Sequence, residues 1–287
     1  MGKYTGLFFG LTTVDMIYTV CRHVGNNEKL KAQSLRCYAG GPAANAAVAF
    51  SALNGESGLH TSLGEHPVAQ LARDDLAEHG VELFDYVSDS SRLPVVSSIM
   101  VNAQSGDRAV VYTHNQQLLQ NDFRSKEIDF STVDVVLCDG HYLEDAVTFA
   151  LMAKEADVVV VLDGGSWKPG FEKLLELADY AICSDDFFPP GCQSQDEVFS
   201  FLGRYSLAGC AISKGEKPIV FQQGLEQESI EVPAVEAVDT LGAGDILHGA
   251  FCYQIINHSF AQSLQNAAQI ASQACRYPGT RAWIAHQ

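Results

Sequence analysis

The sequence predicts an α/β fold, in which helices cover both faces of a mostly parallel central sheet. Two observations lead to it. Apolar runs occupy 6–10, 133–138 and 158–163, and the last two are rich in β-branched residues. Runs without polar alternation are typical of strands buried on both faces. Between the last two runs, 143–155 carries apolar residues at helical spacing. This βαβ unit predicts a parallel sheet with a right-handed crossover.

The later part of the chain continues this alternation. Short apolar runs at 180–183 and 210–213 predict two more strands, and helices are expected over 170–177 and 196–205. Two long helices are expected in the last part of the chain, over 243–256 and 260–275. A chain of 287 residues with 47% hydrophobic content can bury a large core. We therefore expect a single domain over residues 1–287.

Three segments break the pattern and predict a small β-lid. They cover about 11–20, 32–39 and 94–113, where polar and apolar residues are mixed. The third segment predicts a hairpin of 95–102 with 108–113 around the turn 104–107. Strands that interrupt a βαβ series have to leave the main sheet, so we expect them to cover one end of it.

Composition excludes several classes of protein. The net charge is −17, from 35 acidic against 18 basic residues. The sequence contains no Lys/Arg cluster of the kind found in nucleic-acid-binding proteins, which disfavours that class. No run approaches the ~18 apolar residues of a membrane span. The N-terminal stretch lacks a cleavage signal and predicts a core strand, so a cytoplasmic location is expected. The eight cysteines show no CxxC pair or metal spacing, which favours reduced thiols.

The strongest local signal is Asp-Thr-Leu-Gly-Ala-Gly-Asp at 239–245, a loop that runs directly into a helix. Gly242 and Gly244 let the backbone approach a ligand. The first-turn amides are unpaired at the positive end of the helix dipole, which predicts an anion hole for a phosphoryl group. Asp245 is then placed to accept a proton from an attacking hydroxyl. The alternative is an ordinary loop-to-helix junction with aspartate as a cap.

A second signal is the double glycine Gly40-Gly41, which opens a run of small residues with Asn45 one turn into the expected helix. Small residues permit close packing, and the glycines expose their amides to a ligand. Taken alone, the segment is equally explained as a tight helix start.

Together the two motifs resemble those of one family. The 239–245 segment resembles the DTxGAGD motif of the ribokinase-like (PfkB) carbohydrate kinases, and Gly40-Gly41 with Asn45 resembles their N-terminal double-glycine motif. The order of the motifs and the chain length also match. The resemblance implies a three-layer ribokinase-like sandwich with a β-lid. It also implies ATP-dependent phosphorylation of a hydroxyl of a small sugar.

The resemblance implies roles for particular residues. Asp245 would be the catalytic base, and Arg108 on the lid would reach phosphate or substrate, unless it is simply a surface arginine. The other implied roles group by ligand. The anion hole would be Gly242, Ala243 and Gly244; the sugar site Asp15, Gly40, Gly41 and Asn45; and the ATP site Ser213, Lys214 and Gly215.

The resemblance also implies cofactors and a partner. ATP with Mg²⁺ is expected, and parts of the family bind a monovalent cation near the segment that corresponds to 239–245. The family's N-x-x-E magnesium motif is not evident, because 183–187 reads Cys-Ser-Asp-Asp-Phe. Asp185 and Asp186 are candidates there, and the metal ligands stay open. Apolar lid strands favour pairing of two chains into a homodimer.

Within the family the sequence most resembles the ketohexokinase and sulfofructose kinase branch, which implies a ketose or ketose derivative as acceptor. Two departures weaken the resemblance to this branch. Pro42 stands where ketohexokinases commonly have asparagine, and proline cannot offer a side-chain hydrogen bond. The segment 140–142 contains no arginine that could bind a sulfonate. A nucleoside kinase on the same fold is one alternative, and a non-catalytic sugar or nucleotide sensor is another. An NAD-linked oxidoreductase is disfavoured because no GxGxxG follows the first strand.

Overall fold

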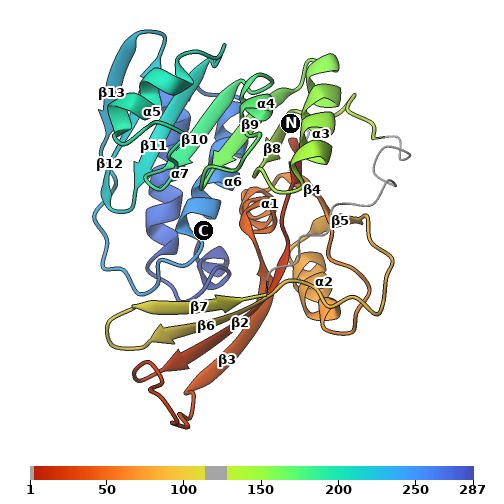
Figure 1. The fold of residues 1–287 in the computed structure, drawn as a ribbon, viewed down its shortest axis with the longest axis vertical. Helices are drawn as coiled ribbons and strands as arrows, with labels where there is room; N and C mark the ends of the chain where they lie inside the picture. Colours follow the sequence, from red (N-terminus) through yellow and green to blue (C-terminus); the bar gives the residue numbers. More distant parts are fainter. Residues whose placement is uncertain (1–2, 114–127) are drawn as a thin grey trace.

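The computed structural model describes residues 3–113 and 128–287 (Figure 1). Its main sheet has nine strands in the order β13-β12-β11-β10-β9-β8-β1-β4-β5. The strands from β5 to β11 run parallel, and β12 and β13 are antiparallel at one edge. The strands are β1 (Thr5–Phe9), β4 (Glu56–Thr61), β5 (Val81–Asp85), β8 (Val135–Cys138), β9 (Val159–Gly164), β10 (Tyr180–Ser184), β11 (Gly209–Lys214), β12 (Lys217–Gln223) and β13 (Glu226–Ile230). The predicted mostly parallel sheet is confirmed.

Helices cover both faces of this sheet, as predicted. One face packs against α1 (Pro42–Ala52), α2 (Ala69–Glu78), α6 (Ala243–Ile255) and α7 (Phe260–Ala274). The other packs against α3 (Leu143–Glu155), α4 (Glu172–Leu175) and α5 (Gln195–Leu202). The short 3-10 helix η2 (Ala282–His286) follows α7. Alternation of side chains places Phe8 of β1 in the first core and Phe9 in the second.

Two predicted helices are shorter than expected. The helix expected over 170–177 is reduced to the four residues of α4. The helix expected over 196–205 begins one residue earlier and ends at Leu202. A capping box explains why the helix begins here. The Ser194 side chain accepts a hydrogen bond from the Glu197 amide, and the Glu197 side chain accepts one from the Ser194 amide.

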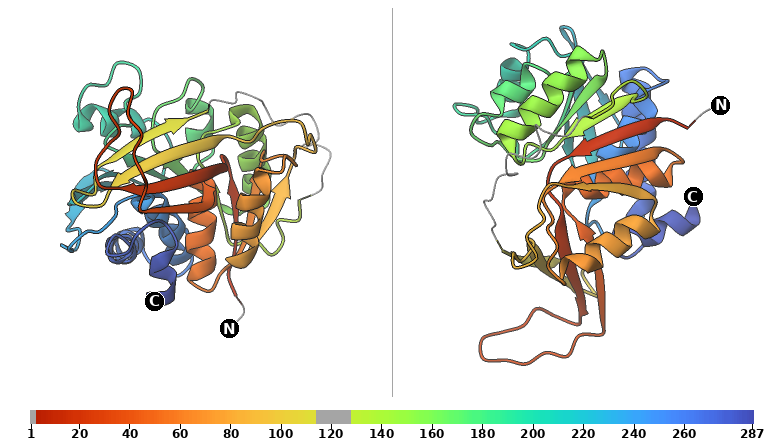
Figure 2. Two further views of the ribbon diagram at one scale, coloured as in Figure 1. Left: turned by 90° about the horizontal axis from the view of Figure 1, so that it is seen from below. Right: turned by 90° about the vertical axis from the view of Figure 1, so that its right-hand side faces the viewer.

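A second sheet forms the lid, with the strand order β3-β2-β6-β7. Its strands are β2 (Thr13–Val20), β3 (Ser34–Gly40), β6 (Val96–Asn102) and β7 (Arg108–Tyr112). The lid projects from one end of the three-layer body (Figure 1, Figure 2). The inner face of the lid packs Ile17, Ile99 and Val101 against Leu241, so it lies over the loop that precedes α6. The three segments expected to form a lid supply these strands.

The order of the strands locates the crevice in which α/β proteins bind ligands. From β1 the chain builds β4 and β5 on one side, and then returns to form β8 on the other side. The winding direction therefore changes between β1 and β8. Ligands of open α/β sheets bind at the carboxyl ends of strands at such a point. Gly10 and Asp139 follow these two strands directly.

Close contact between α1 and α6 brings the two sequence motifs together. A Cβ atom on Gly249 of α6 would lie 2.2 Å from the carbonyl oxygen of Ala46. Only glycine permits this approach of two helix backbones. The start of α1, with Asn45, is thereby held against the start of α6.

In residues 3–113 and 128–287, no helix combines the length and the apolar character that a membrane crossing requires. All eight cysteines lie in this part of the chain and are unpaired thiols. Cys138, Cys183, Cys210 and Cys252 are buried, as expected for core thiols, whereas Cys21 is exposed.

Candidate active site

The first turn of α6 offers free amides. Gly242 caps the helix in a left-handed conformation (φ 70°), and no side chain caps the turn. The Ala243 amide donates to the Thr240 carbonyl (3.3 Å), and the Ile246 amide to the Gly242 carbonyl (2.9 Å). Within the described residues, no acceptor faces the Gly244 and Asp245 amides that lie between them. Such a turn attracts an anion.

The two glycines of this turn serve different purposes. A Cβ atom on Gly242 would lie 2.6 Å from Thr280 Cγ2, and the positive φ of Gly242 already disfavours any other residue. Gly244 is exposed, and a Cβ atom there would meet no protein atom within 4 Å. The space beside Gly244, on the side where a Cβ atom would stand, is therefore open.

Asp245 stands in this turn, partly exposed. Its Oδ2 accepts a hydrogen bond from Nδ2 of Asn45 at 2.7 Å. Burial raises the pKa of Asp245, and the nearby Asp163 carboxylate raises it further, while the Asn45 bond and His248 lower it. The resulting pKa is about 7. A carboxyl group with a pKa near neutrality is suited to exchange a proton with a substrate.

Behind the turn lies a buried His248–Asp163 pair. His248 Nδ1 faces the Gly244 carbonyl (2.7 Å), and Nε2 faces the Ile182 carbonyl (3.0 Å) and Asp163 Oδ1 (3.5 Å). Both ring nitrogens face acceptors, which favours hydrogen on both and therefore the imidazolium form. Burial lowers the pKa of His248, but Asp163 and the two carbonyl groups raise it above its ordinary value. In this form the ring places a positive charge beneath the open amides.

Asp15 points from β2 of the lid toward the same region. Its Oδ1 accepts a hydrogen bond from the Thr13 hydroxyl at 2.6 Å. A Cβ atom on Gly40 would lie 2.1 Å from Asp15 Oδ2, so the glycine makes room for this carboxylate. Gly41 has a φ of 95°, and a Cβ atom there would lie 2.3 Å from the Leu11 carbonyl oxygen. Burial raises the pKa of Asp15, although Thr13 and Ser97 oppose the rise.

Asp139 joins the loops at the crevice. Its Oδ2 accepts from the amides of Leu11 (2.9 Å) and Ala43 (3.2 Å), and its Oδ1 accepts from the His141 amide (2.9 Å). Burial would raise the pKa of Asp139, but His141, Lys168 and these bonds hold it at about 2. This carboxylate fixes the double-glycine segment against the end of β8.

The lid reaches the loop before α6. Nη1 of Arg108 donates to the Thr240 hydroxyl at 3.4 Å. The loop itself is held by Asp239, which accepts hydrogen bonds from the amides of Leu241 (2.9 Å) and Gly279 (2.8 Å). Arg108 thus lies beside the glycine turn and remains exposed.

The other predicted residues lie farther along the same sheet edge. The Ser213 hydroxyl donates to the Cys183 carbonyl (3.3 Å), and Lys214 Nζ lies 3.2 Å from Asp185 Oδ2. Gly215 forms the tight turn from β11 to β12 with a φ of 56°. None of the recorded hydrogen bonds or ion pairs between described residues links Ser213, Lys214 or Gly215 to Asp245.

Sequence reasoning missed four residues of this region. Asp139 and Asp163 end or follow buried apolar strands, and that position was a usable signal. His248 lies one turn after Asp245, but only the structure shows that it meets Asp163. Arg281 donates from Nη1 to Asn45 Oδ1 at 2.9 Å, and its sequence surroundings carry no sign of this.

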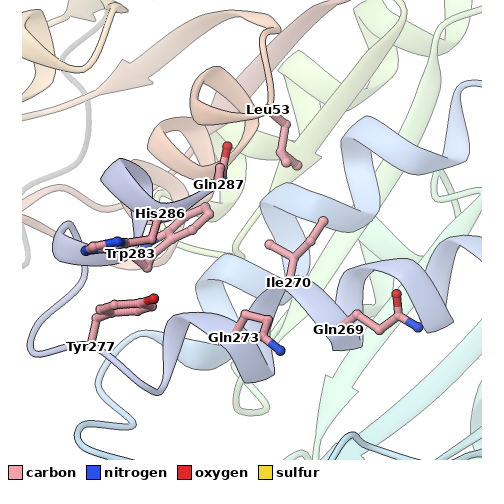
Figure 3. A pocket seen from close by; sticks show the side chains of 8 residues that line it. All are labelled: Leu53, Gln269, Ile270, Gln273, Tyr277, Trp283, His286 and Gln287. Atoms are coloured by element: carbon pink, nitrogen blue, oxygen red, sulfur yellow. The ribbon is translucent and has the colours of Figure 1, made fainter.

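Two sizeable hollows lie elsewhere. One, of about 420 Å³, is lined by Tyr277, Trp283 and His286 among others (Figure 3). The second, of about 590 Å³, lies over Gly58 and Phe84 of the sheet. Asp245 lines neither of them, so the candidate site is the open turn of α6 rather than either hollow.

Comparison with known proteins places the chain in a family. The model of the pfkB family of carbohydrate kinases matches residues 7–286. A ribokinase of Staphylococcus aureus is 23% identical over 255 residues, covering 85% of this chain and 84% of the ribokinase. Ketohexokinase of Mus musculus is 22% identical over 290 residues, covering 95% of this chain and 96% of the ketohexokinase.

The fold is shared with solved structures. That of Arabidopsis thaliana ribokinase complexed with ribose and ATP superposes with a TM-score of 0.75 at 21% identity, over 97% of this chain and 94% of that chain. The predicted ribokinase-like fold is confirmed. Because the family model covers nearly the whole chain, this protein belongs to the pfkB family of carbohydrate kinases and is a phosphotransferase with an alcohol group as acceptor.

Proposed function

We propose that this protein transfers the γ-phosphate of ATP to a hydroxyl of a ketose or a ketose derivative, with Asp245 as the base. One observation carries the proposal: among the described residues the amides of Gly244 and Asp245 have no hydrogen-bond acceptor, and they lie beside open space at Gly244 and beside a carboxyl group. Phosphoryl transfer needs alignment and charge stabilisation more than covalent chemistry. The open turn of α6 can supply both.

In this proposal the residues of the turn act on the reacting groups. Gly242, Ala243 and Gly244 form the turn of the anion hole, and the free amides of Gly244 and Asp245 stabilise charge on the transferred phosphoryl group. Asp245 accepts the proton of the sugar hydroxyl as that hydroxyl attacks in line. The His248 imidazolium beneath the turn adds positive potential at the same place.

The sugar lies between the lid and α6. Asp15 is the proposed acceptor for sugar hydroxyls, because it is the buried carboxylate on the inner face of the lid. Gly40 leaves room for the Asp15 carboxylate and Gly41 for the Leu11 carbonyl, so both shape the sugar site. Asn45 meets the sugar beside Asp245. The lid would exclude water, which otherwise competes with the sugar as acceptor. The ketose rests on the resemblance of the sequence to the ketohexokinase branch, since ribokinase at 23% identity and ketohexokinase at 22% are similar to this chain to nearly the same degree.

The nucleotide lies over the carboxyl ends of β10 and β11, beside Ser213, Lys214 and Gly215. Arg108 of the lid is the proposed cation for a phosphate, since it reaches Thr240 of the neighbouring loop. No group of three or more metal-binding side chains occurs in the described part of the chain. Mg²⁺ takes one or two carboxylates with waters and phosphates, and Asp185 fits that role. When bound, Mg²⁺ neutralises phosphate charge.

The acceptor can be tested directly. ADP formation should be measured with ATP and Mg²⁺ against fructose, other ketoses, ribose, deoxyribose and adenosine. We expect turnover to be fastest with a ketose. Fastest turnover with ribose or deoxyribose would show that the acceptor is an aldose and not a ketose. Fastest turnover with adenosine would show that the acceptor is a nucleoside. Tight sugar binding in calorimetry without ADP formation would indicate a sensor instead.

The pH dependence of activity follows from Asp245. Its pKa is raised to about 7, and a base works only when ionised, so activity is lost as the pH falls through 7. We expect kcat/KM for the best sugar to rise with an apparent pKa of about 7. Rates across pH values on both sides of neutrality, at saturating ATP, would measure it. An acid limb centred near the ordinary aspartate pKa of ~4 would contradict the assignment.

The outer face of the lid is the proposed dimer surface. Leu35 is 52% exposed and Val111 68% exposed, and both point away from the core of the lid. Exposed apolar patches of this kind favour association. We expect a dimer in sedimentation velocity and a monomer for Val111→Lys. Leu225→Lys, at an exposed leucine in the β12–β13 turn, should stay dimeric. A monomeric unmodified chain would contradict this surface.

A further inference from the structure

A buried arginine near the C-terminus is bound from several sides. Arg281 lies between α7 and η2 and is only 6% exposed. Its guanidinium donates to Asp75 Oδ2 at 2.9 and 3.1 Å and to the Ala39 carbonyl at 2.7 Å. It also donates to the Thr280 hydroxyl and to Asn45 Oδ1, both at 2.9 Å. These acceptors come from four separate parts of the fold.

The bond to Asn45 determines how that side chain is oriented. A guanidinium has donors only, so it must face the oxygen of the Asn45 amide and not its NH₂ group. The NH₂ group is then turned to the other side, where Nδ2 donates to Asp245 Oδ2 at 2.7 Å. Asn45 is 5% exposed, so little water is present to replace either partner.

We propose that Arg281 is a positioning residue of the active site, which holds the oxygen of Asn45 so that the NH₂ group of this amide faces Asp245. Without Arg281, the two ends of the amide can exchange by rotation of the side chain. The amide oxygen would then face the carboxylate and repel it. The inference rests on the proposed function only in so far as Asp245 is the catalytic base.

The arrangement has a consequence for the charge on Asp245. A donor to the carboxylate favours its ionised form. The titratable groups that act on Asp245 are Asp163 of β9 and Asp15 of the lid, which favour the protonated form, and His248 of α6, which opposes them. The Asn45 amide works with His248 against burial and the two carboxylates. Loss of its orientation therefore raises the pKa of Asp245.

A purely structural role for Arg281 makes a different prediction. Its ion pair with Asp75 ties α2 and β3 to the C-terminal segment. If that were its whole role, replacing it would lower stability and leave the titration of Asp245 unchanged. Asp75→Asn breaks the same ion pair but leaves the guanidinium beside Asn45, so it separates the two roles.

The test is an infrared titration of protein labelled with ¹³C at the aspartate carboxyl groups. Subtracting the spectrum of labelled Asp245→Asn isolates Asp245. We expect a midpoint of about 7 in the unmodified chain and in Asp75→Asn. In Arg281→Met the midpoint should rise by about one pH unit, the size expected for one lost bond to a charged group. Arg276→Met, an exposed arginine of the same segment, is the matched control and should not shift it.

Further variants keep the inference testable. Asn45→Leu should raise the midpoint as Arg281→Met does, and combining the two should add nothing, because both act through one hydrogen bond. If Arg281→Met does not fold, Asp75→Asn with Arg281→Met removes both buried charges and carries the same expectation. An unchanged midpoint in a folded variant without Arg281 overturns the inference.

The titration needs no sugar, so it tests the role of Arg281 independently of the proposed function. Full activity in Asp245→Asn would reject Asp245 as base, whatever the titration gives. An inactive Asp245→Asn together with an unshifted Arg281→Met midpoint would reject only the role of Arg281.

Discussion

Asp245→Asn is expected to lower turnover about a thousandfold, within the range that general-base catalysis contributes. Asparagine has nearly the shape of aspartate but cannot accept the hydroxyl proton at neutral pH. The amides of the α6 turn stay in place, so ATP should bind with nearly unchanged affinity. Steady-state kinetics with the best sugar of the panel, and calorimetry with ATP, measure the two effects separately.

Asp196→Asn provides a matched control for this variant. Asp196 is also an acidic residue in the first turn of a helix, α5, but it is exposed and lies outside the candidate site. Its replacement should leave turnover unchanged. Near-native turnover in Asp245→Asn would rule out Asp245 as the base, and the open turn would then serve only for binding.

Gly249→Ala is expected to lower the free energy of unfolding by about 2–3 kcal/mol, as other overpacked sites do. The added Cβ atom would lie 2.2 Å from the Ala46 carbonyl oxygen and 2.8 Å from the Ala49 Cβ atom. Both belong to α1, so the two helices have to separate. Since their contact sets Asn45 against Asp245, activity should fall together with stability. Urea denaturation measures the change in the free energy of unfolding.

Gly244→Ala is the matched control, because it makes the same change in the same helix. Its Cβ atom would meet no protein atom within 4 Å. Alanine is the better helix former by about 1 kcal/mol, so this variant should be equally or more stable. The added methyl group enters the open space beside the free amides, so ATP binding should weaken. Equal stability losses in the two variants would contradict the close packing at Gly249.

Much of the fold could be predicted because its central strands are buried on both faces. Continuous apolar runs predicted β1, β8 and β9, whose inner positions contain almost no polar residues. β4 escaped notice for the opposite reason. Ser57, His60 and Thr61 are buried in it and interrupt the apolar pattern. The edge strand β13 is mostly exposed and polar, so it too carried no such signal.

The candidate site divides in the same way. Glycines followed by a carboxylate at a helix start predict free amides and a nearby acid, because helix geometry relates these groups to their close neighbours in the chain. The resemblance to carbohydrate kinases then associated Asn45 with Asp245. The ion pair behind the turn and the bond from Arg281 to Asn45 were not predicted.

By itself, the sequence determined an α/β fold with a lid and predicted a phosphate-binding turn with a carboxylate beside it, since these depend on residues close together in the chain. The tertiary structure decided which way the Asn45 amide faces, that His248 meets Asp163, and that α1 and α6 meet at Gly249. Each of these joins side chains from distant segments, and only packing of the whole chain brings such segments within hydrogen-bond distance.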